Sequence, residues 1–95
     1  MIYEREVNSL GSLMKEIVRL DSDAGIRLTG TYNGSKCLVF ISRSAVGYAA
    51  IVCSLRKGSG VAPGRRVHAA DFLSARELQR FLKKVAGGRV AAFVY

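Results

Sequence analysis

The sequence predicts an α+β fold, an antiparallel four- to five-stranded sheet with two helices on one face, in the order α-β-β-β-β-α-β. Two segments carry apolar residues at helical spacing, and the segments between them alternate apolar and polar residues. Asn33-Gly34 joins two of the alternating segments and is a strong hairpin signal. The 95 residues are expected to form one domain, residues 1–95, because domains of about 100–150 residues are the commonest.

The first part of the chain is predicted to hold one helix. Residues 2–7 are expected to form a short strand or an extended arm. Ser9 is a suitable N-cap, and apolar residues follow it at helical spacing, so we expect a helix from Ser9 to Leu20. The polar segment Asp21–Gly25 would end this helix.

Two turns are predicted to set the register of the next three strands. Asn33-Gly34 is typical of a two-residue type I′ turn. Gly47 is expected to close a three-residue loop in the left-handed conformation, which would pair Ser44 with Tyr48. Together the two registers predict a core face made of Ile26, Leu28, Cys37, Val39, Ile41, Ile51, Cys53 and Leu55.

The opposite face of these strands is predicted to stay open. It would consist of Arg27, Thr29, Thr31, Lys36, Leu38, Phe40, Ser42, Tyr48, Ala50, Val52, Ser54 and Arg56. Exposed aromatic rings beside cations suit a single-stranded nucleic acid, whose unpaired bases can stack. Two alternatives stay open: Phe40, Leu38 and Val52 could pack on a partner subunit or on the C-terminal strand, or the face is simply solvated.

The second half of the chain is predicted to add two strands and a helix. Residues 57–66 form a glycine-rich basic loop that could grip a nucleic-acid backbone or be an ordinary surface loop. Residues 67–72 are expected to form the fourth strand and 89–95 the last. Between them, Ser74 and Glu77 have the spacing of a capping box, which predicts the start of the second helix.

The charge distribution favours a polyanionic partner. The chain has 15 Lys and Arg against 7 Asp and Glu, a net charge of +8, and only Asp71 and Glu77 are acidic beyond residue 25. Such a steep imbalance indicates nucleic acid rather than a mixed solvated surface. A chain that is 49% hydrophobic is also too apolar to be a disordered basic tail.

The residue types that most enzymes need are scarce. His68 is the single histidine, and Cys37 and Cys53 lie in apolar runs where buried thiols are expected. We therefore expect no catalysis, no metal and no cofactor. The chain shows no secretion signal and no apolar run long enough for a membrane span, so a cytoplasmic protein without a membrane partner is predicted.

The function predicted from these observations is non-catalytic binding of single-stranded DNA, with RNA as another single-stranded partner. The residues expected to contact it are Arg27, Lys36, Phe40, Arg43, Tyr48, Arg56, Lys57, Arg65, Arg66 and His68. A thin core and an apolar sheet face also predict a homo-oligomer, a dimer or a tetramer. The alternatives are an architectural protein that binds RNA or duplex, and a protein-interaction module that uses the sheet face as a dimer interface.

Two families resemble parts of this pattern. The run Ala62-Pro63-Gly64-Arg65-Arg66-Val67, followed by Phe72-Leu73-Ser74 and a helix from Ala75, loosely resembles the end of the positive cofactor four family. The whole-chain plan is more similar to the ThermoDBP-related single-stranded DNA-binding proteins of hyperthermophilic archaea. The resemblance implies an archaeal oligomer that encloses single strands, with Phe40, Tyr48 and the basic residues of the open face as contacts.

Overall fold

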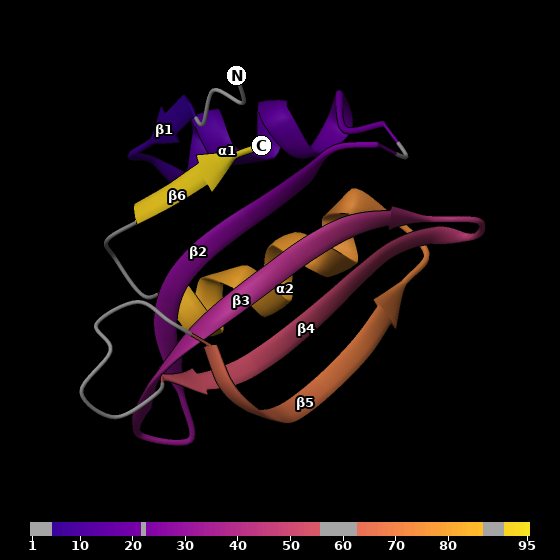
Figure 1. Cartoon of the computed structure of the whole chain (residues 1–95). Coiled ribbons are helices and arrows are strands. Elements are labelled where there is room, and N and C mark those ends of the chain that lie inside the picture. Colours follow the sequence, from indigo (N-terminus) through magenta and orange to yellow (C-terminus); the bar gives the residue numbers. More distant parts are fainter. Residues whose placement is uncertain (1–4, 22, 56–62, 87–90) are drawn as a thin grey trace.

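The computed structural model describes residues 5–21, 23–55, 63–86 and 91–95. Its elements are β1 (Arg5–Val7), α1 (Leu10–Val18), β2 (Gly25–Tyr32), β3 (Ser35–Ser44), β4 (Gly47–Leu55), β5 (Pro63–Phe72), α2 (Ala75–Ala86) and β6 (Ala91–Val94) (Figure 1). The predicted α+β class with two helices is confirmed, and all strand pairs are antiparallel. The sheet has six strands rather than four to five, because β1 pairs with β6.

The strand order in the sheet is β1-β6-β2-β3-β4-β5. The last strand of the chain therefore lies inside the sheet, between β1 and β2. Ala92 is the register partner of Val7 on one side and of Leu28 on the other. Figure 1 shows β6, in yellow, beside β2 at the end of the sheet where α1 lies.

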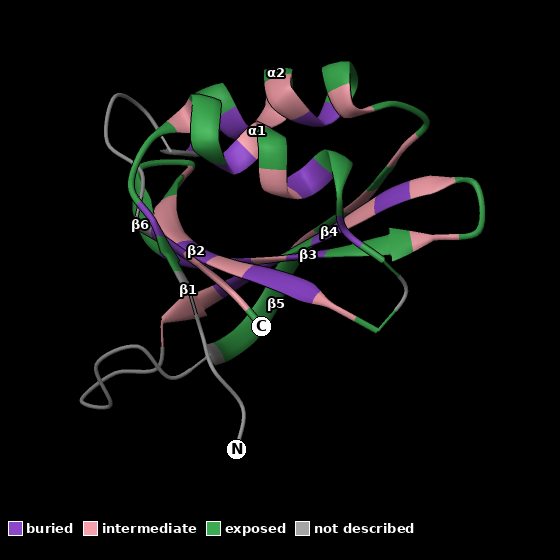
Figure 2. Ribbon diagram, turned by 90° about the horizontal axis from the view of Figure 1, so that it is seen from above, coloured by how far each residue is buried: buried purple, intermediate pink, exposed green. Residues whose placement is uncertain are grey.

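Both helices lie on the same side of the sheet (Figure 2), and each begins at a serine cap. The Ser12 amide donates to Ser9 Oγ at 3.2 Å, as expected for the N-cap of α1. At α2, the Glu77 amide donates to Ser74 Oγ at 3.3 Å, and the Glu77 carboxylate accepts from the Leu73 amide at 3.0 Å. The predicted capping box is confirmed. The bond to the Glu77 carboxylate comes from the amide of Leu73, one residue before the N-cap Ser74.

The hydrophobic core fills the space between the helices and the sheet. Its buried members are Val7, Leu13, Ile17, Leu20, Ile26, Leu28, Cys37, Val39, Ile41, Tyr48, Ala50, Val52, Leu78, Leu82, Val85 and Ala92. The helix α2 approaches β2 very closely at Gly30. A Cβ atom built on Gly30 would lie 2.6 Å from Val85 Cγ1, so only glycine lets the helix sit this low.

The predicted register of the first hairpin is confirmed. Every pair from Ile26 with Ile41 to Tyr32 with Ser35 is present. Asn33 and Gly34 both have positive φ, 50° and 81°, as a type I′ turn requires.

The predicted register of the second hairpin is wrong by one residue. Ser44 pairs with Gly47 and Arg43 with Tyr48, so the loop contains two residues instead of three. Gly47 does not close the loop. It lies within β4, where a Cβ atom would collide with the backbone of Phe72 in β5. Because the segment is apolar on both of its faces, its hydrophobic pattern does not distinguish the two registers.

The shift reverses the two faces of β4. Tyr48, Ala50 and Val52 face the helices and belong to the core. Ile51, Cys53 and Leu55, which were expected in the core, alternate with them and lie on the face away from the helices. Ile51 is accordingly 37% exposed.

We expect Gly30→Ala to destabilise the fold by about 1–3 kcal/mol, because the added methyl group overpacks against Val85. Urea unfolding measures this loss. Gly11→Ala is the control, since nothing lies within 4 Å of its Cβ position and alanine favours the helix. Equal stability of the two variants would contradict the close contact between α2 and β2.

Candidate nucleic-acid interface

We call the sheet face that points away from both helices the open face. In Figure 1 the open face is toward the viewer, and α2 lies behind β2 and β3. One row of register partners crosses this face from edge to edge: Glu6, Phe93, Arg27, Phe40, Ile51 and Ala69. Partners in a sheet project to the same side, so these residues from six strands are lateral neighbours.

The middle of the row is an arginine between two phenylalanines. The Arg27 guanidinium carbon lies 5.1 Å from the ring centroid of Phe93, which is within cation–π distance. Phe40 is the register partner of Arg27 on its other side. All three side chains are half-buried, so each is anchored while part of it stays accessible.

The open face also has an apolar floor. Leu38 is 1% exposed and Cys53 is 9% exposed, yet neither belongs to the core between helices and sheet. They are register partners, two residues along β3 and β4 from the pair of Phe40 and Ile51, and so on the same face. Tyr95 lies over Gly25 at the other end of the face, because a Cβ on Gly25 would be 2.7 Å from the tyrosine ring.

Cations flank this apolar centre. Lys36 follows the turn between β2 and β3, and Arg66 pairs with Cys53 from β5; both side chains are exposed. Two acidic residues share the face, but Glu6 lies on β1 and Asp71 on β5, the two outer strands. Within the described part of the chain, the four inner strands place no carboxylate on the open face.

Four of the predicted contact residues meet on the open face: Arg27, Lys36, Phe40 and Arg66. Tyr48 does not lie on the open face, so the prediction that it is exposed there is wrong. It is 6% exposed and lies in the core, because the register shift turns it toward the helices. Arg43 accompanies it: Arg43 Nη1 donates to the Tyr48 hydroxyl at 2.8 Å, and the guanidinium carbon lies 4.8 Å from the ring centroid.

The remaining predicted contacts lie elsewhere. His68 is the register partner of Val52 and faces the helix side, with its ring centroid 5.2 Å from that of Tyr32. Arg65 is exposed on β5, where its backbone amide donates to Ser54 Oγ at 3.0 Å and its carbonyl accepts from that hydroxyl at 3.3 Å. Arg56 and Lys57 lie outside the described residues.

Two further groups of residues with the right chemistry were missed in the sequence. Phe93 becomes a neighbour of Arg27 only because β6 enters the sheet beside β2, and no local pattern indicates this long-range pairing. The exposed cations of α2 could have been found, since three of them recur every four residues. They are Arg76, Arg80, Lys83 and Lys84.

The Cys37 thiol is poorly suited to nucleophilic chemistry. Burial raises the pKa of the Cys37 thiol, and the charge of a Cys53 thiolate would raise it further, while a hydrogen bond with the Gly30 backbone opposes both effects. Cys37 therefore stays protonated at neutral pH, and a thiol is a weak nucleophile. Both cysteines are free, and they lie on opposite faces of the sheet.

In the described ranges, no three His, Cys, Asp or Glu side chains gather in a way that could hold a metal ion. Neither described helix has the length and hydrophobicity that a membrane crossing requires. Comparison of the chain with models of protein families, with curated proteins and with solved structures found no match. The resemblances to the two DNA-binding families therefore stay predictions.

We expect Tyr48→Ala to cost about 3–5 kcal/mol of stability, the usual range for a buried aromatic side chain. Phe40→Ala, on the open face, should cost clearly less. Tyr48→Phe keeps the ring and loses the bond from Arg43, so a loss of about 1 kcal/mol is expected. Denaturant unfolding of the three variants checks the order, and a more costly Phe40→Ala would contradict the observed register.

Proposed function

We propose that the protein binds single-stranded nucleic acid, DNA in the first place, along the open face and without catalysing a reaction on it. The observation that carries this proposal is the unit of Phe93, Arg27 and Phe40 on three adjacent strands. Unpaired bases stack on aromatic rings, and an arginine beside them can stack or bind phosphate. In a duplex the base faces are hidden, so this unit favours single strands.

The charges around the unit support the same function. A backbone that crosses the open face would meet Lys36 or Arg66 beside the apolar centre. Asp71 lies on the outer strand β5 and Glu6 lies on β1 beside Phe93, so repulsion of phosphate is weakest around Phe40 on the inner strands. The net charge of +8 would add attraction at long range.

A binding role without catalysis is supported by the state of the reactive side chains. His68 is packed against the rings of Tyr32 and Phe81, and Cys37 is a buried thiol with a raised pKa. Neither one faces the open side of the sheet.

We expect Phe40→Ala and Phe93→Ala each to weaken binding of labelled single-stranded DNA by about 1–3 kcal/mol, because each removes a stacking surface. The dependence of affinity on salt should not change, since no cation is lost. Arg66→Ala should instead reduce the slope of log K against log salt by about 0.7, the value for one phosphate contact. Fluorescence anisotropy at several salt concentrations measures both quantities.

Leu73→Ala is the control for the aromatic variants, because this side chain is 74% exposed and lies beyond β5. Normal binding by both phenylalanine variants, or tighter binding of duplex than of single strands, would contradict the proposal. Parallel titrations with single-stranded RNA decide between the two nucleic acids.

The open face also favours self-association as a second role. Ile51 is 37% exposed beside the apolar floor of Leu38 and Cys53, and Tyr95 is 44% exposed at the other end of the face. A second copy packed there would cover these side chains and compete with a strand for Phe40.

If the open face forms a homodimer, light scattering should give twice the 10.3 kDa chain mass at micromolar concentration. Ile51→Asp should return the mass to that of one chain, because it places a carboxylate in the apolar contact. Val46→Asp is the control, because Val46 is 67% exposed in the turn between β3 and β4, outside the face. A single-chain mass for the unmodified protein would rule out this dimer.

A further inference from the structure

The two described helices do not cover the helix-side face of the sheet to its end. α2 ends at Ala86, just after Val85 has met β2 at Gly30. Beyond this contact β2 continues to Tyr32, and two hollows lie there, of about 310 and 250 Å³. The larger is lined by Thr31, Tyr32, Asn33, His68, Phe81, Lys84 and Val85. We call the two hollows together the corner site.

Three flat rings build one wall of the corner site. The centroids of Tyr32 and His68 are 5.2 Å apart and those of His68 and Phe81 are 6.1 Å apart, with interplanar angles of 23° and 24°. The rings come from β2, β5 and α2, and all three are half-buried. They form a nearly parallel stack at the edge of the core, and all three line the larger hollow.

The rest of the corner site is polar and basic. Thr31, Asn33 and the exposed Lys84 surround the rings in the larger hollow. The smaller hollow shares Tyr32 and Asn33 and adds two serines, Ser35 and Ser54, with Lys36. Among the described residues, no aspartate or glutamate lines either hollow.

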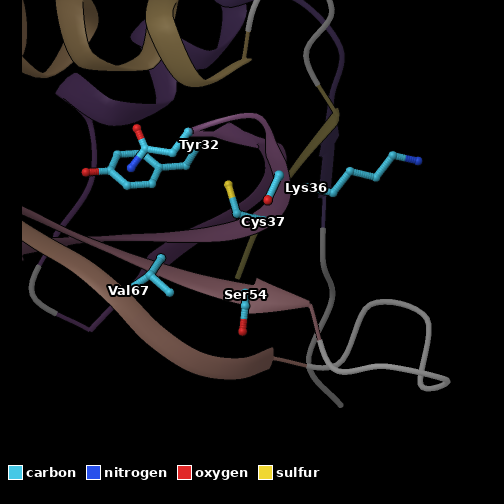
Figure 3. A pocket seen from close by; sticks show the side chains of 7 residues that line it. Tyr32, Lys36, Cys37, Ser54 and Val67 are labelled. Carbon is cyan, nitrogen blue, oxygen red and sulfur yellow. The ribbon is translucent and has the colours of Figure 1, made fainter.

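Figure 3 shows the smaller hollow at close range. The Tyr32 ring lies on one side of it, Val67 and Ser54 lie on the other, and the Cys37 thiol points toward the side of the tyrosine. Lys36 extends outward, away from the hollow, so its ammonium group is placed for an anion outside the rim. Tyr32 therefore separates two spaces, each with apolar walls and hydrogen-bonding groups.

We propose that the corner site binds a nucleotide unit, with the base against the stack of Tyr32, His68 and Phe81 and the phosphate at Lys84. A flat aromatic ligand matches the parallel rings, and a phosphate matches the cation and the lack of carboxylates. A space of about 310 Å³ lies at the small end of ligand pockets, which suits one nucleotide rather than a larger molecule.

The nucleotide unit could be free or part of a strand. Lys36 belongs both to the open face and to the rim of the smaller hollow, so a strand bound on the open face could continue into the corner site. That version rests on the proposed function, whereas binding of a free nucleotide does not.

The test uses His68, because it is the single histidine of the chain and its ring stands in the stack. Its ring signals in a carbon–proton NMR spectrum are followed while adenosine 5′-monophosphate, adenosine or a short oligothymidylate is added to the protein. We expect a saturable shift with the monophosphate or the oligonucleotide. Adenosine should bind more weakly, because it lacks the phosphate.

Lys84→Gln should weaken binding of the phosphate-bearing probe about five- to tenfold, since a charge-assisted hydrogen bond is lost. Lys83→Gln is the matched control: it removes the same charge from the preceding residue of α2, which does not line the hollow. Both side chains are exposed, so neither change threatens folding. Phe81→Leu should weaken binding about tenfold by removing a ring from the stack.

If the monophosphate shifts the His68 signals, the corner site binds free nucleotides. If only the oligonucleotide shifts them, the corner site binds a nucleotide that is part of a strand. If the oligonucleotide binds by anisotropy but leaves the His68 signals in place, the corner site is wrong and the proposed function stands. Equal effects of Lys83→Gln and Lys84→Gln would also overturn it. If no probe binds, both proposals fail.

Discussion

The close contact between α2 and β2 at Gly30 determines which surfaces of the sheet are covered. Because Gly30 has no side chain, Val85 reaches the strand itself, and the helix lies low enough to contact β4 and β5 as well. The two described helices do not cover the opposite face of the sheet, or the part of β2 and β3 beyond the end of α2 (Figure 2). Both candidate surfaces thus follow from where one helix sits.

The aromatic side chains on the two surfaces share a degree of burial that suits binding. Phe40 and Phe93 on the open face, and Tyr32 and Phe81 in the corner site, are all half-buried. A ring held on one side by its own fold has already lost most of its rotational freedom. A ligand that stacks on its other side therefore does not have to order it, which lowers the entropic cost of binding. Fully exposed rings would lack this advantage, and fully buried rings would offer no surface.

The parts of the fold that could be predicted are those set by local chemistry. The Asn33-Gly34 turn, the Ser9 cap and the pair of Ser74 and Glu77 each satisfy backbone groups within a few residues, so their spacing in the sequence was sufficient. The second hairpin was predicted wrongly because Gly47 serves a contact with β5 and not the turn itself. The same error moved Tyr48 from the core to the surface.

In the candidate site too, the residues set by local pairing could be predicted, and those set by long-range pairing could not. Arg27, Lys36 and Phe40 follow from the first hairpin alone, and the structure places them on the expected face. Phe93 depends on the insertion of β6 beside β2, and the stack of Tyr32, His68 and Phe81 depends on three elements that meet from distant parts of the chain. Contacts of this range are decided by the packing of the whole sheet, which no short pattern contains.

The position of β6 has a consequence for the order in which the chain can fold. β2 pairs with β3 through a tight turn, so this hairpin can form early, but its other edge stays open until residues 91–94 arrive. β1 has no described partner strand except β6, so the N-terminal strand must also wait. Pairing of such distant segments is slow because a long loop must close first. During synthesis on a ribosome, the edge of β2 would remain unpaired until the last strand has emerged, and an open edge of this kind invites pairing with other chains.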